Sequence, residues 1–447
     1  MDLSSMLSSY SKKILRKGKL FNHILQQLQA NEKLTYENLV EYQNRMVSLN
    51  IEKAYKEVAY YKNLLDSLKI NPQEIKTIED LKSLPILKKS SIRGQERQFV
   101  SNAWRWKFKT TTSGTTGTPV KLSRDIFSVN FEHAAIWRQR NWAKCFLNEP
   151  YVSLRGDVVI SPQASEPPFW KYISTDNKLV MSSYHLSEQF IPYYIEKIRQ
   201  FSPAFIEGYP SAIYRLARYM QIHDEPPIKV KAVFTSSETV LEYRRLAIEE
   251  CFGSILDHYG QAERVSHIAM CEHGNYHYMM DYSLSEFLPT DDDDIYRVVG
   301  TTFHNRAMPL IRYDTGDFVV IKDFHKTCSC GRPFPVIDSI EGRQEDYILT
   351  PSGKYIGGMG IIFGGLANLV EGQIIQEKLD LIRVLIVATD NFNYQNEKLL
   401  VNNLKDRVGD DMNIIIQKTD SIERTKRGKH KLTISLVDKE KTLRECK

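Results

Sequence analysis

Short apolar runs alternate with amphipathic segments from about residue 150 onward, and this alternation constrains the fold more than any other feature of the sequence. Strands that alternate with helices in this way are typical of an α/β sheet covered by helices. The sequence therefore predicts an α/β fold for its central part. The candidate strands lie at 152–160, 204–207, 230–234 and 254–258, and the candidate helices at 211–221 and in the segment that ends at residue 250.

The flanking parts of the chain have other patterns. Residues 1 to about 95 predict helices, with Thr35 and Thr77 as N-cap residues and acidic residues in the first turn after Thr77. A further helix is expected over residues 126–145, and a strand, a helix and a strand over residues 373–389. We find no catalytic cluster in the first 95 residues.

Length and charge limit the kinds of protein that this chain can be. A chain of 447 residues exceeds one ordinary core, so two or more domains are expected. The net charge is only +5, because 60 basic and 55 acidic residues are interspersed. A nucleic-acid-binding surface needs clustered basic residues, and the sequence has no such block. We therefore expect small-molecule partners and no nucleic acid.

The sequence predicts neither a signal peptide nor a membrane span. The basic segment 8–20 lacks an apolar core, and we interpret it as a solvated helix face, with a helix on a membrane surface as the alternative. The longest uncharged stretch, 355–370, is short and contains five glycines. The six cysteines are then expected to be reduced thiols in the cytoplasm.

A run rich in Thr, Ser and Gly lies between residues 110 and 119. Its glycines, Gly114 and Gly117, allow the backbone to turn sharply and to approach a ligand closely. Its hydroxyls and amides are donors without negative charge, which suits a polyphosphate. The Gly-x4-Gly-Lys-Ser/Thr spacing of the P-loop is absent. An ordinary surface loop is the alternative interpretation of the run alone.

Several polar turns follow predicted strands. Ser236–Glu238 and Tyr259–Glu263 come directly after strands, at the strand end where open α/β sheets bind ligands. The segments Arg312–Asp317 and Glu341–Asp346 carry carboxylates and Arg on Gly-bearing turns, which suits a ribose or a phosphate. The segment Glu423–Lys431 is basic. Taken alone, each turn is also explained as an ordinary cap or a solvated face.

Together and in this order, the segments 110–119, 259–263, 312–317, 342–346 and 424–429 resemble the motif series of the adenylate-forming superfamily. That superfamily includes acyl-CoA synthetases, nonribosomal adenylation domains and luciferases. The Thr235–Glu238 turn, the Cys-Gly-Arg at 330–332 and the run 373–376 resemble more narrowly the branch of phenylacetate–CoA ligase and the capsule-biosynthesis protein CapK. The resemblance covers about residues 35–435.

The resemblance implies a fold and a division into domains. The expected fold is α/β, with a large N-terminal adenylation domain over residues 1–345 and a small α+β C-terminal domain over residues 346–447. Relatives turn this small domain, as a mobile lid, about a hinge residue that matches Asp346.

The resemblance also implies roles for single residues. Lys429 is expected to reach the α-phosphate and the carboxylate of the substrate, Glu263 to bind Mg²⁺, and Thr116 to act in catalysis from the loop. Asp317 is expected to accept hydrogen bonds from the ribose, with Arg343 nearby. The remaining expected nucleotide-binding residues are Thr112, Ser113, Gly114, Thr115 and Gly117 for the phosphates, and Ser236, Ser237, Glu238, Tyr259 and Gly260 for the adenine.

The implied reaction has two steps. A carboxylic acid attacks the α-phosphate of ATP and forms an acyl-adenylate with release of pyrophosphate, and coenzyme A or a carrier-protein thiol then takes the acyl group. One alternative is an enzyme of capsule or surface-polysaccharide biosynthesis that passes the acyl group to another acceptor, such as an amino sugar. Another is a non-catalytic nucleotide-binding relative. The sequence identifies neither the acid nor the oligomeric state.

Two positions depart from the family pattern. Glu423 stands where the family usually has Pro, and Lys121 lies one residue later than the usual basic position. The acyl pocket is expected to include His133 and Tyr209, although packing alone also explains His133.

Cysteine and histidine spacing suggests a separate metal site. Cys271, His277, Cys328 and Cys330 form a candidate Cys3His zinc site, with His277 preferred over His273 as the fourth ligand. Similar placement in the resembling branch supports this hypothesis. The four acidic residues 291–294 are expected to form a solvated turn.

Overall fold

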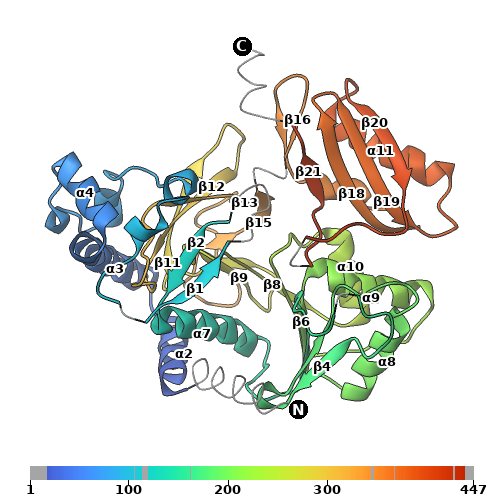
Figure 1. The fold of residues 1–447 in the computed structure, drawn as a ribbon, viewed down its shortest axis with the longest axis horizontal. Helices are drawn as coiled ribbons and strands as arrows, with labels where there is room; N and C mark the ends of the chain where they lie inside the picture. Colours follow the sequence, from blue (N-terminus) through green and yellow to red (C-terminus); the bar gives the residue numbers. More distant parts are fainter. Residues whose placement is uncertain are drawn as a thin grey trace. The chain divides into compact units, whose positions relative to one another are not determined.

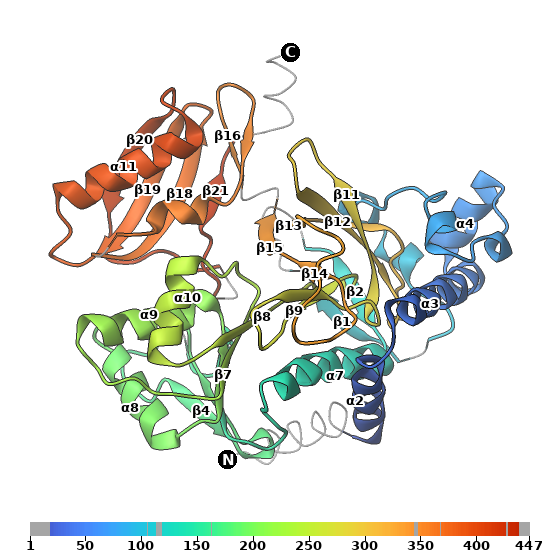
Figure 2. The same ribbon diagram turned by 180° about the vertical axis from the view of Figure 1, so that it is seen from behind.

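The computed structural model describes residues 18–104, 106–112, 119–161, 163–343, 347–366, 368–425 and 428–437, without the side chain of residue 343. The chain divides into two compact units (Figures 1 and 2). Unit 1 comprises Met1–Glu149, Ser174–Asn177 and Leu256–Ile340, and unit 2 comprises Pro150–Ile173, Lys178–Ile255 and Glu341–Lys447. The domain boundary expected at residues 345 and 346 stays a prediction.

The described part of unit 1, from residue 18, begins with helices, as predicted. Thr35 caps α3, because its hydroxyl accepts a hydrogen bond from Asn38 N at 3.3 Å, and Thr77 and Asp80 form a capping box at α5. The elements are α2 (Lys19–Asn31), α3 (Tyr36–Glu57), α4 (Ala59–Leu68), η1 (Pro72–Glu74), α5 (Ile78–Leu81), α6 (Lys89–Ile92) and η2 (Glu96–Phe99).

The other described elements of unit 1 include a strand hairpin, two antiparallel sets of strands and one long helix. The hairpin of β1 (Phe108–Thr111) and β2 (Lys121–Arg124) leads into α7 (Ile126–Trp142), which lies beside α2 (Figures 1 and 2). An antiparallel sheet follows the order β11 (Ser283–Pro289), β12 (Ile295–Thr302), β13 (Tyr313–Val320). A second antiparallel set has the order β14 (Val336–Ile337), β10 (Tyr276–Tyr278), β9 (His267–Met270), β8 (Ile255–Gly260). The remaining elements are η3 (Ser174–Asp176) and β15 (Ser339–Arg343), whose residues are divided between the units.

Unit 2 contains the predicted α/β sheet. Its strands follow the order β7 (Ala232–Ser236), β6 (Phe205–Gly208), β3 (Tyr151–Leu154), β5 (Lys178–Met181), β4 (Trp170–Ile173). All neighbours are parallel except β4 and β5. The helices α8 (Ile191–Phe201), α9 (Pro210–Ile222) and α10 (Glu242–Cys251) contribute side chains to one apolar core with these strands. Burial of β3 and β6 along their whole length is what a helix-covered parallel sheet requires.

The strand predicted over residues 152–160 is wrong after Leu154. Arg155, Gly156 and Asp157 interrupt the apolar run, and Gly156 has a φ of 72°, so the backbone leaves the sheet there.

The described residues of unit 2 between 347 and 437 form a small α+β layer, as predicted. The sheet order is β20 (Asn413–Lys418), β19 (Leu381–Ala388), β18 (Leu369–Lys378), β21 (Thr433–Ser435), and α11 (Tyr394–Val408) packs on it through Leu400, Leu404 and Val408. A short hairpin of β16 (Ile348–Leu349) and β17 (Tyr355–Ile356) and the helix η5 (Met359–Phe363) precede the sheet.

The strand–helix–strand pattern expected over residues 373–389 is wrong. β18 continues through a tight turn into its antiparallel neighbour β19, with Lys378 opposite Leu381. Ile382, Val384 and Ile386 are fully buried at every second position, which is the period of a strand and not of a helix. The intervening segment is too short for a helix.

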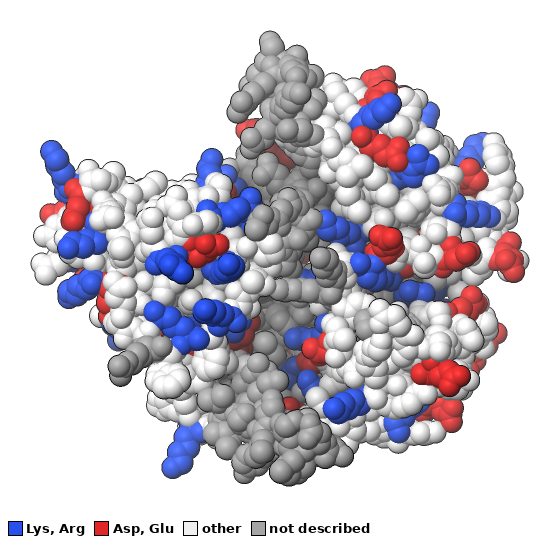
Figure 3. Space-filling model, viewed as in Figure 1, with Lys and Arg blue, Asp and Glu red and all other residues white. Residues whose placement is uncertain are grey.

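The surface agrees with the nearly balanced charge of the sequence. On the face drawn in Figure 3, Lys and Arg side chains are interspersed with Asp and Glu side chains. Residues 291–294 are all exposed in the turn between β11 and β12, as expected. Within the described residues, every helix is too short or too polar to span a bilayer.

Candidate functional site

The Thr-rich run is carried by the β1–β2 hairpin of unit 1. Thr111 pairs with Lys121, and Thr112 is buried at the end of the stem. Thr112 N donates to Val120 O at 3.0 Å, and Thr112 Oγ1 accepts from Val120 N at 3.0 Å. Ser113, Gly114, Thr115, Thr116 and Gly117 lie outside the described residues. Their phosphate-binding role therefore stays a prediction, and the stem fixes where their segment begins and ends.

Two of the predicted nucleotide-binding residues of unit 1 are hydrogen-bonded to each other. Tyr259, near the end of β8, donates its hydroxyl to Asp317 Oδ2 on β13 at 2.7 Å. Burial, and then the Asp317 carboxylate, raises the pKa of Tyr259 well above its ordinary value. The phenol thus remains a donor, and it orients the carboxylate that the sequence assigns to the ribose.

The carboxylate of Glu263, the predicted magnesium ligand, is also oriented by a tyrosine. Tyr313 on β13 donates its hydroxyl to Glu263 Oε1 at 3.0 Å. Sequence reasoning missed Tyr313 as a partner, although it lies inside the Arg-Tyr-Asp-Thr-Gly-Asp motif.

Two arginines fasten the Tyr259–Glu263 turn to the neighbouring elements of unit 1. Arg124 at the end of β2 donates to Ala262 O, and Arg264 donates to Ser128 Oγ on α7 at 2.7 Å. Arg264 also faces Glu132 on α7 at 3.6 Å. Burial alone raises the pKa of Glu132, but Arg264, His267, the hydrogen bond from Tyr282 and Arg124 together lower it to about 2. Contacts of the Arg124 and Arg264 guanidinium groups therefore join the β1–β2 stem, α7 and the Tyr259–Glu263 turn.

In unit 2 the structure brings the predicted catalytic lysine to the predicted adenine turn. Lys429 Nζ donates to Ser237 O at 3.4 Å and lies 5.8 Å from the ring centroid of Tyr209. Ser236 ends β7, and Ser237 has a φ of 74°. The side chain of Arg343 lies outside the described residues, so its predicted role is not tested.

The carboxylate of Glu238 is held by the protein itself. Glu238 Oε2 accepts from Ser211 N at 3.0 Å, and Glu238 Oε1 accepts from His430 N at 2.7 Å. Ser211 lies in the first turn of α9, where the helix dipole favours a negative charge. No local sequence signal points to these bonds, since the partners of Glu238 lie 27 and 192 residues away.

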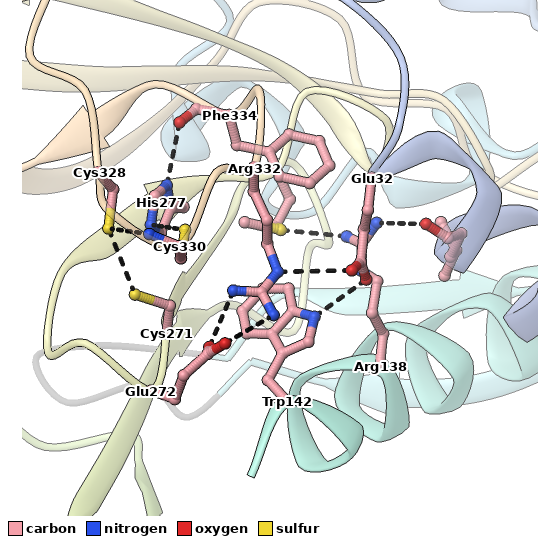
Figure 4. A network of polar contacts seen from close by, with 12 residues as sticks. Glu32, Arg138, Trp142, Cys271, Glu272, His277, Cys328, Cys330, Arg332 and Phe334 are labelled. Atoms are coloured by element: carbon pink, nitrogen blue, oxygen red, sulfur yellow. Dashed lines mark hydrogen bonds and ion pairs between the residues drawn. The ribbon is translucent and has the colours of Figure 1, made fainter. Parts of the chain in front are cut away.

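The four predicted metal ligands converge in unit 1 (Figure 4). The ligand atoms of Cys271, His277, Cys328 and Cys330 all lie within 4.8 Å of one another. Cys271 Sγ is 3.7 Å from Cys328 Sγ, and Cys330 Sγ is 3.5 Å from His277 Nε2.

The hydrogen bond of His277 fits a metal ligand. His277 Nδ1 lies 2.9 Å from Phe334 O, and a carbonyl only accepts, so Nδ1 carries the proton. The lone pair of Nε2 is then directed at the cysteines, as in zinc-bound histidines whose other nitrogen donates to a carbonyl. His273 instead contacts Ser329 Oγ at 2.9 Å. The donor set and its geometry therefore fit Zn²⁺ with His277 as the fourth ligand.

Arg332, directly beyond the Cys328–Cys330 ligand pair, links the cluster to two helices (Figure 4). Its guanidinium pairs with Glu272 at 2.8 and 3.1 Å, lies 3.4 Å from Glu32, and is 4.2 Å from the ring centroid of Trp142. Trp142 Nε1 in turn donates to Glu32 Oε1 at 2.9 Å. The sequence suggested the Cys-Gly-Arg motif but not this role in packing.

Comparisons with known proteins agree with the motif series. The model of the CapK C-terminal domain matches residues 348–436. Protein CapK of Staphylococcus aureus is 23% identical over 439 residues, which are 97% of each chain. The phenylacetate-coenzyme A ligase of Thermus thermophilus is 24% identical over 71% of this chain and 73% of its own length.

Among solved structures, the fold is similar to that of 2-hydroxyisobutyryl-CoA ligase. The crystal structure in the postadenylation state with R3-HIB-AMP matches with a TM-score of 0.70 at 16% identity, over 93% of both chains. This likeness shows that the chain shares the fold of a CoA ligase solved in its postadenylation state. In sequence, the chain is similar to CapK and to phenylacetate-coenzyme A ligase, and its residues 348–436 match the CapK C-terminal domain.

Proposed function

We propose that this protein activates a carboxylic acid with ATP to an acyl-adenylate, releases pyrophosphate, and then transfers the acyl group to coenzyme A. The observation that carries the proposal is the position of Lys429, whose ammonium contacts the Ser236–Glu238 turn. The names of the similar proteins add support, since one is a phenylacetate-coenzyme A ligase and another was solved with an acyl-adenylate and CoA.

The proposed roles follow the chemistry of each side chain. Asp317, oriented by Tyr259, accepts hydrogen bonds from the ribose hydroxyls, and Glu263, oriented by Tyr313, holds Mg²⁺. Mg²⁺ supplies charge neutralisation at the phosphates when it is bound. The hydroxyls of residues 112–117 and the amides of residues 113–117 bind the phosphate oxygens.

In the first half-reaction a carboxylate oxygen of the acid forms a bond to the α-phosphorus, and the bond from that phosphorus to the bridging oxygen breaks. Pyrophosphate leaves with the electron pair. Lys429 holds the carboxylate and the α-phosphate together and neutralises the charge between two anions, so it acts by positioning and electrostatics. In the second half-reaction the coenzyme A sulfur forms a bond to the acyl carbon, and AMP leaves.

We also propose that residues 346–447 act as a lid that turns between the two half-reactions. The match of a C-terminal domain model to residues 348–436 supports a separate small domain there. His133 on α7 and the buried Tyr209 remain the proposed residues of the acyl pocket.

A panel of carboxylic acids tests the first half-reaction. Purified protein, ATP and Mg²⁺ are incubated with each acid, and release of pyrophosphate is measured. We expect at least one acid to give release above the rate without acid. Suppose that the protein binds ATP but shows neither acid-dependent pyrophosphate release nor ATP–pyrophosphate exchange across a broad panel. That result would favour the non-catalytic alternative.

The acyl acceptor is tested with the acid that the panel identifies. Release of AMP that requires coenzyme A supports the thioester product. The match to CapK over 97% of both chains favours a second candidate, transfer to another acceptor such as an amino sugar or a carrier protein. Pyrophosphate release with no acceleration of AMP release by coenzyme A would support that candidate.

We further propose that the Cys3His cluster binds one structural Zn²⁺. The proposal rests on the convergence of four ligand atoms within 4.8 Å and on the bond of His277 to Phe334 O.

A further inference from the structure

Lys429 is presented by a short hairpin of unit 2. The Lys429 hairpin comprises residues 424–430, of which 426 and 427 lie outside the described residues. Arg424 pairs with His430 across it, Thr425 N donates to Lys429 O at 3.0 Å, and Lys429 N donates to Thr425 Oγ1 at 3.1 Å. Gly428 has a φ of 71°, and a Cβ there would come within 2.8 Å of Ser183 Oγ. The backbone on either side of Lys429 is thus held in one conformation.

A single carboxylate joins this hairpin to α9. Glu238 Oε1 accepts from His430 N at 2.7 Å and from Ser211 Oγ at 3.1 Å, while Glu238 Oε2 accepts from Ser211 N. A carboxylate that accepts from backbone amides forms charge-assisted bonds, which are stronger than neutral ones. The amide that Glu238 binds belongs to the residue next to Lys429, so the carboxylate acts on the position of the lysine.

The side chain of His430 makes a second contact with unit 2. The ring is buried, and its Nδ1 lies 3.2 Å from Arg244 Nη2 on α10. A guanidinium only donates, so His430 Nδ1 accepts and carries no proton. The contact therefore requires a neutral imidazole.

The groups around His430 carry more positive than negative charge. They are Arg244 on α10, Arg215 on α9, Arg424 on the hairpin itself, Glu371 on β18, and the Glu238 carboxylate at the backbone. Glu371 pairs with Arg424 in the interior. Three arginines against two carboxylates make this site unfavourable for a charged imidazole.

We propose that Glu238 and the neutral His430 are positioning residues that fasten the Lys429 hairpin for the adenylation half-reaction, and that a proton on His430 releases it. The inference deepens the proposed function and rests on it for the role of Lys429. Neither residue is assigned contact with the reacting atoms. Glu238 and His430 set where the lysine stands.

The stability of the fastened hairpin decreases as the pH falls. Burial lowers the pKa of His430 well below its ordinary value, Glu371 partly opposes this, and the arginines add to it. The fastened hairpin thus binds a proton less readily than a released hairpin, whose histidine has an ordinary pKa of about 6.5. The contribution of the neutral His430 to holding the hairpin is fully present above about pH 6.5 and weakens as the pH falls below that value. Glu371, whose pKa is lowered to about 2, stays charged throughout this range.

Hydrogen–deuterium exchange on the full chain, without ATP or acid, tests the fastening. Rates for the peptide that contains the His430 amide are corrected for the intrinsic effect of pH. We expect protection at pH 7.5 that falls about tenfold or more in Glu238→Ala, because a bond to a charged acceptor is lost. Glu242→Ala, at an exposed residue in the first turn of α10, is the matched control and should keep the protection.

His430 variants separate the hydrogen bond from the proton. His430→Asn places an amide oxygen near the position of Nδ1 and does not titrate, so we expect protection at pH 7.5 and no change of protection between pH 7.5 and 5.5. His430→Leu should lose protection at both values. His223→Asn, at an exposed histidine, should behave as wild type. A pH-dependent loss that persists in His430→Asn, or an unprotected amide in the wild type at pH 7.5, overturns the proposal.

Kinetics with an acid from the panel then tests the role in catalysis. His430→Leu should lower kcat for pyrophosphate release about tenfold or more while thioester formation from supplied acyl-adenylate stays within twofold, and His430→Asn should restore release. Equal loss in both half-reactions, with the amide still protected, would reject the positioning role. If no acid supports release, the proposed function fails, and the exchange experiment still decides whether the hairpin is fastened.

Discussion

At the scale of single residues, each unit contains candidate binding groups whose charge is oriented by a neighbour. Tyr259 orients Asp317, Tyr313 orients Glu263, and Glu238 is bonded at both oxygens. A carboxylate held in this way loses little conformational freedom when a ligand binds, so each of these groups is oriented before a ligand arrives.

Lys429→Ala removes the proposed cation from the adenylation step. We expect acid-dependent pyrophosphate release to fall by a factor of about 10² to 10³, as for loss of a group that stabilises developing charge. Thioester formation from supplied acyl-adenylate should remain nearly intact. Lys398→Ala, at an exposed lysine of α11, is the control. A similar loss in both half-reactions would contradict the role of Lys429 in adenylation alone.

Asp317→Ala removes the proposed ribose acceptor. We expect the KM for ATP to rise about tenfold or more, because charge-assisted hydrogen bonds to the ribose are lost. The thermal midpoint should fall by a few degrees, because Asp317 is buried and the Tyr259 hydroxyl loses its acceptor. Steady-state pyrophosphate release at varied ATP measures the effect, with Asp293→Ala in the exposed turn as the control. An unchanged KM would place the ribose elsewhere.

At the scale of elements, the sequence predicted those parts whose signals are local. The helical start, α7 and the strands β6, β7 and β8 follow from periodicity and caps, and the structure confirms them. The strand predicted over residues 155–160 is wrong because a polar segment with a glycine ends the strand there. The helix predicted within residues 373–389 is wrong because a tight turn joins two strands there. Local propensity does not reveal such events when apolar residues continue on both sides.

The hydrogen-bond partners of the candidate site residues could not be predicted from the sequence for a different reason. Glu238 and His430 are 192 residues apart, and Tyr259 and Asp317 are 58 residues apart. Motif order predicted nucleotide contact for Glu238, Tyr259 and Asp317 but not for His430, and only the folded strands and loops determine which side chain bonds to which.

Zinc is expected to fasten the loop before β14 to β9 and β10. Gently purified protein should contain about one zinc per chain, and Cys328→Ser should lose the metal and lower the thermal midpoint by several degrees. Cys251→Ser is the control, since its thiol donates to Ala217 O and a hydroxyl retains that bond. Elemental analysis and thermal unfolding measure both effects. Wild-type protein without stoichiometric zinc would reject the site.

Arg332→Ala should destabilise unit 1 without removing the metal. The change leaves Glu272 without its paired guanidinium and uncovers Trp142, so we expect a loss of about 1–3 kcal/mol in the free energy of unfolding. Denaturant unfolding measures this loss, and Arg97→Ala at an exposed residue is the control. A stability equal to wild type would contradict the linking role of Arg332.

At the scale of the whole molecule, both units contain ionisable groups whose burial makes stability depend on pH. Glu132 in unit 1 and Glu371 in unit 2 each have a pKa lowered to about 2, where arginines outweigh the effect of burial. A carboxyl with a lowered pKa contributes stability above its unfolded value of about 4.3, and that stability is lost as the pH falls toward 2. Neither unit is therefore expected to survive strong acid.

Two buried histidines of unit 1 begin this loss at higher pH. Burial lowers the pKa of His267 and of His304 to about 4, and the nearby carboxylates Glu132 and Asp281 only partly oppose it. The folded state holds both rings neutral, whereas the unfolded chain takes up protons near pH 6.5. Stability should therefore fall from about pH 6.5 toward pH 4, with each histidine contributing up to about 1.4 kcal/mol per pH unit.

Denaturant unfolding at pH 7.5, 6.5, 5.5 and 4.5 measures that slope. His304→Asn removes one titrating group and should make the curve shallower by about one proton, although the lost stacking on Phe131 lowers the value at pH 7.5. His223→Asn, at an exposed ring, should leave the slope unchanged. A wild-type stability that does not change between pH 6.5 and 4.5 would mean that neither buried ring stays neutral, because a group with the same pKa in both states contributes no pH dependence to folding.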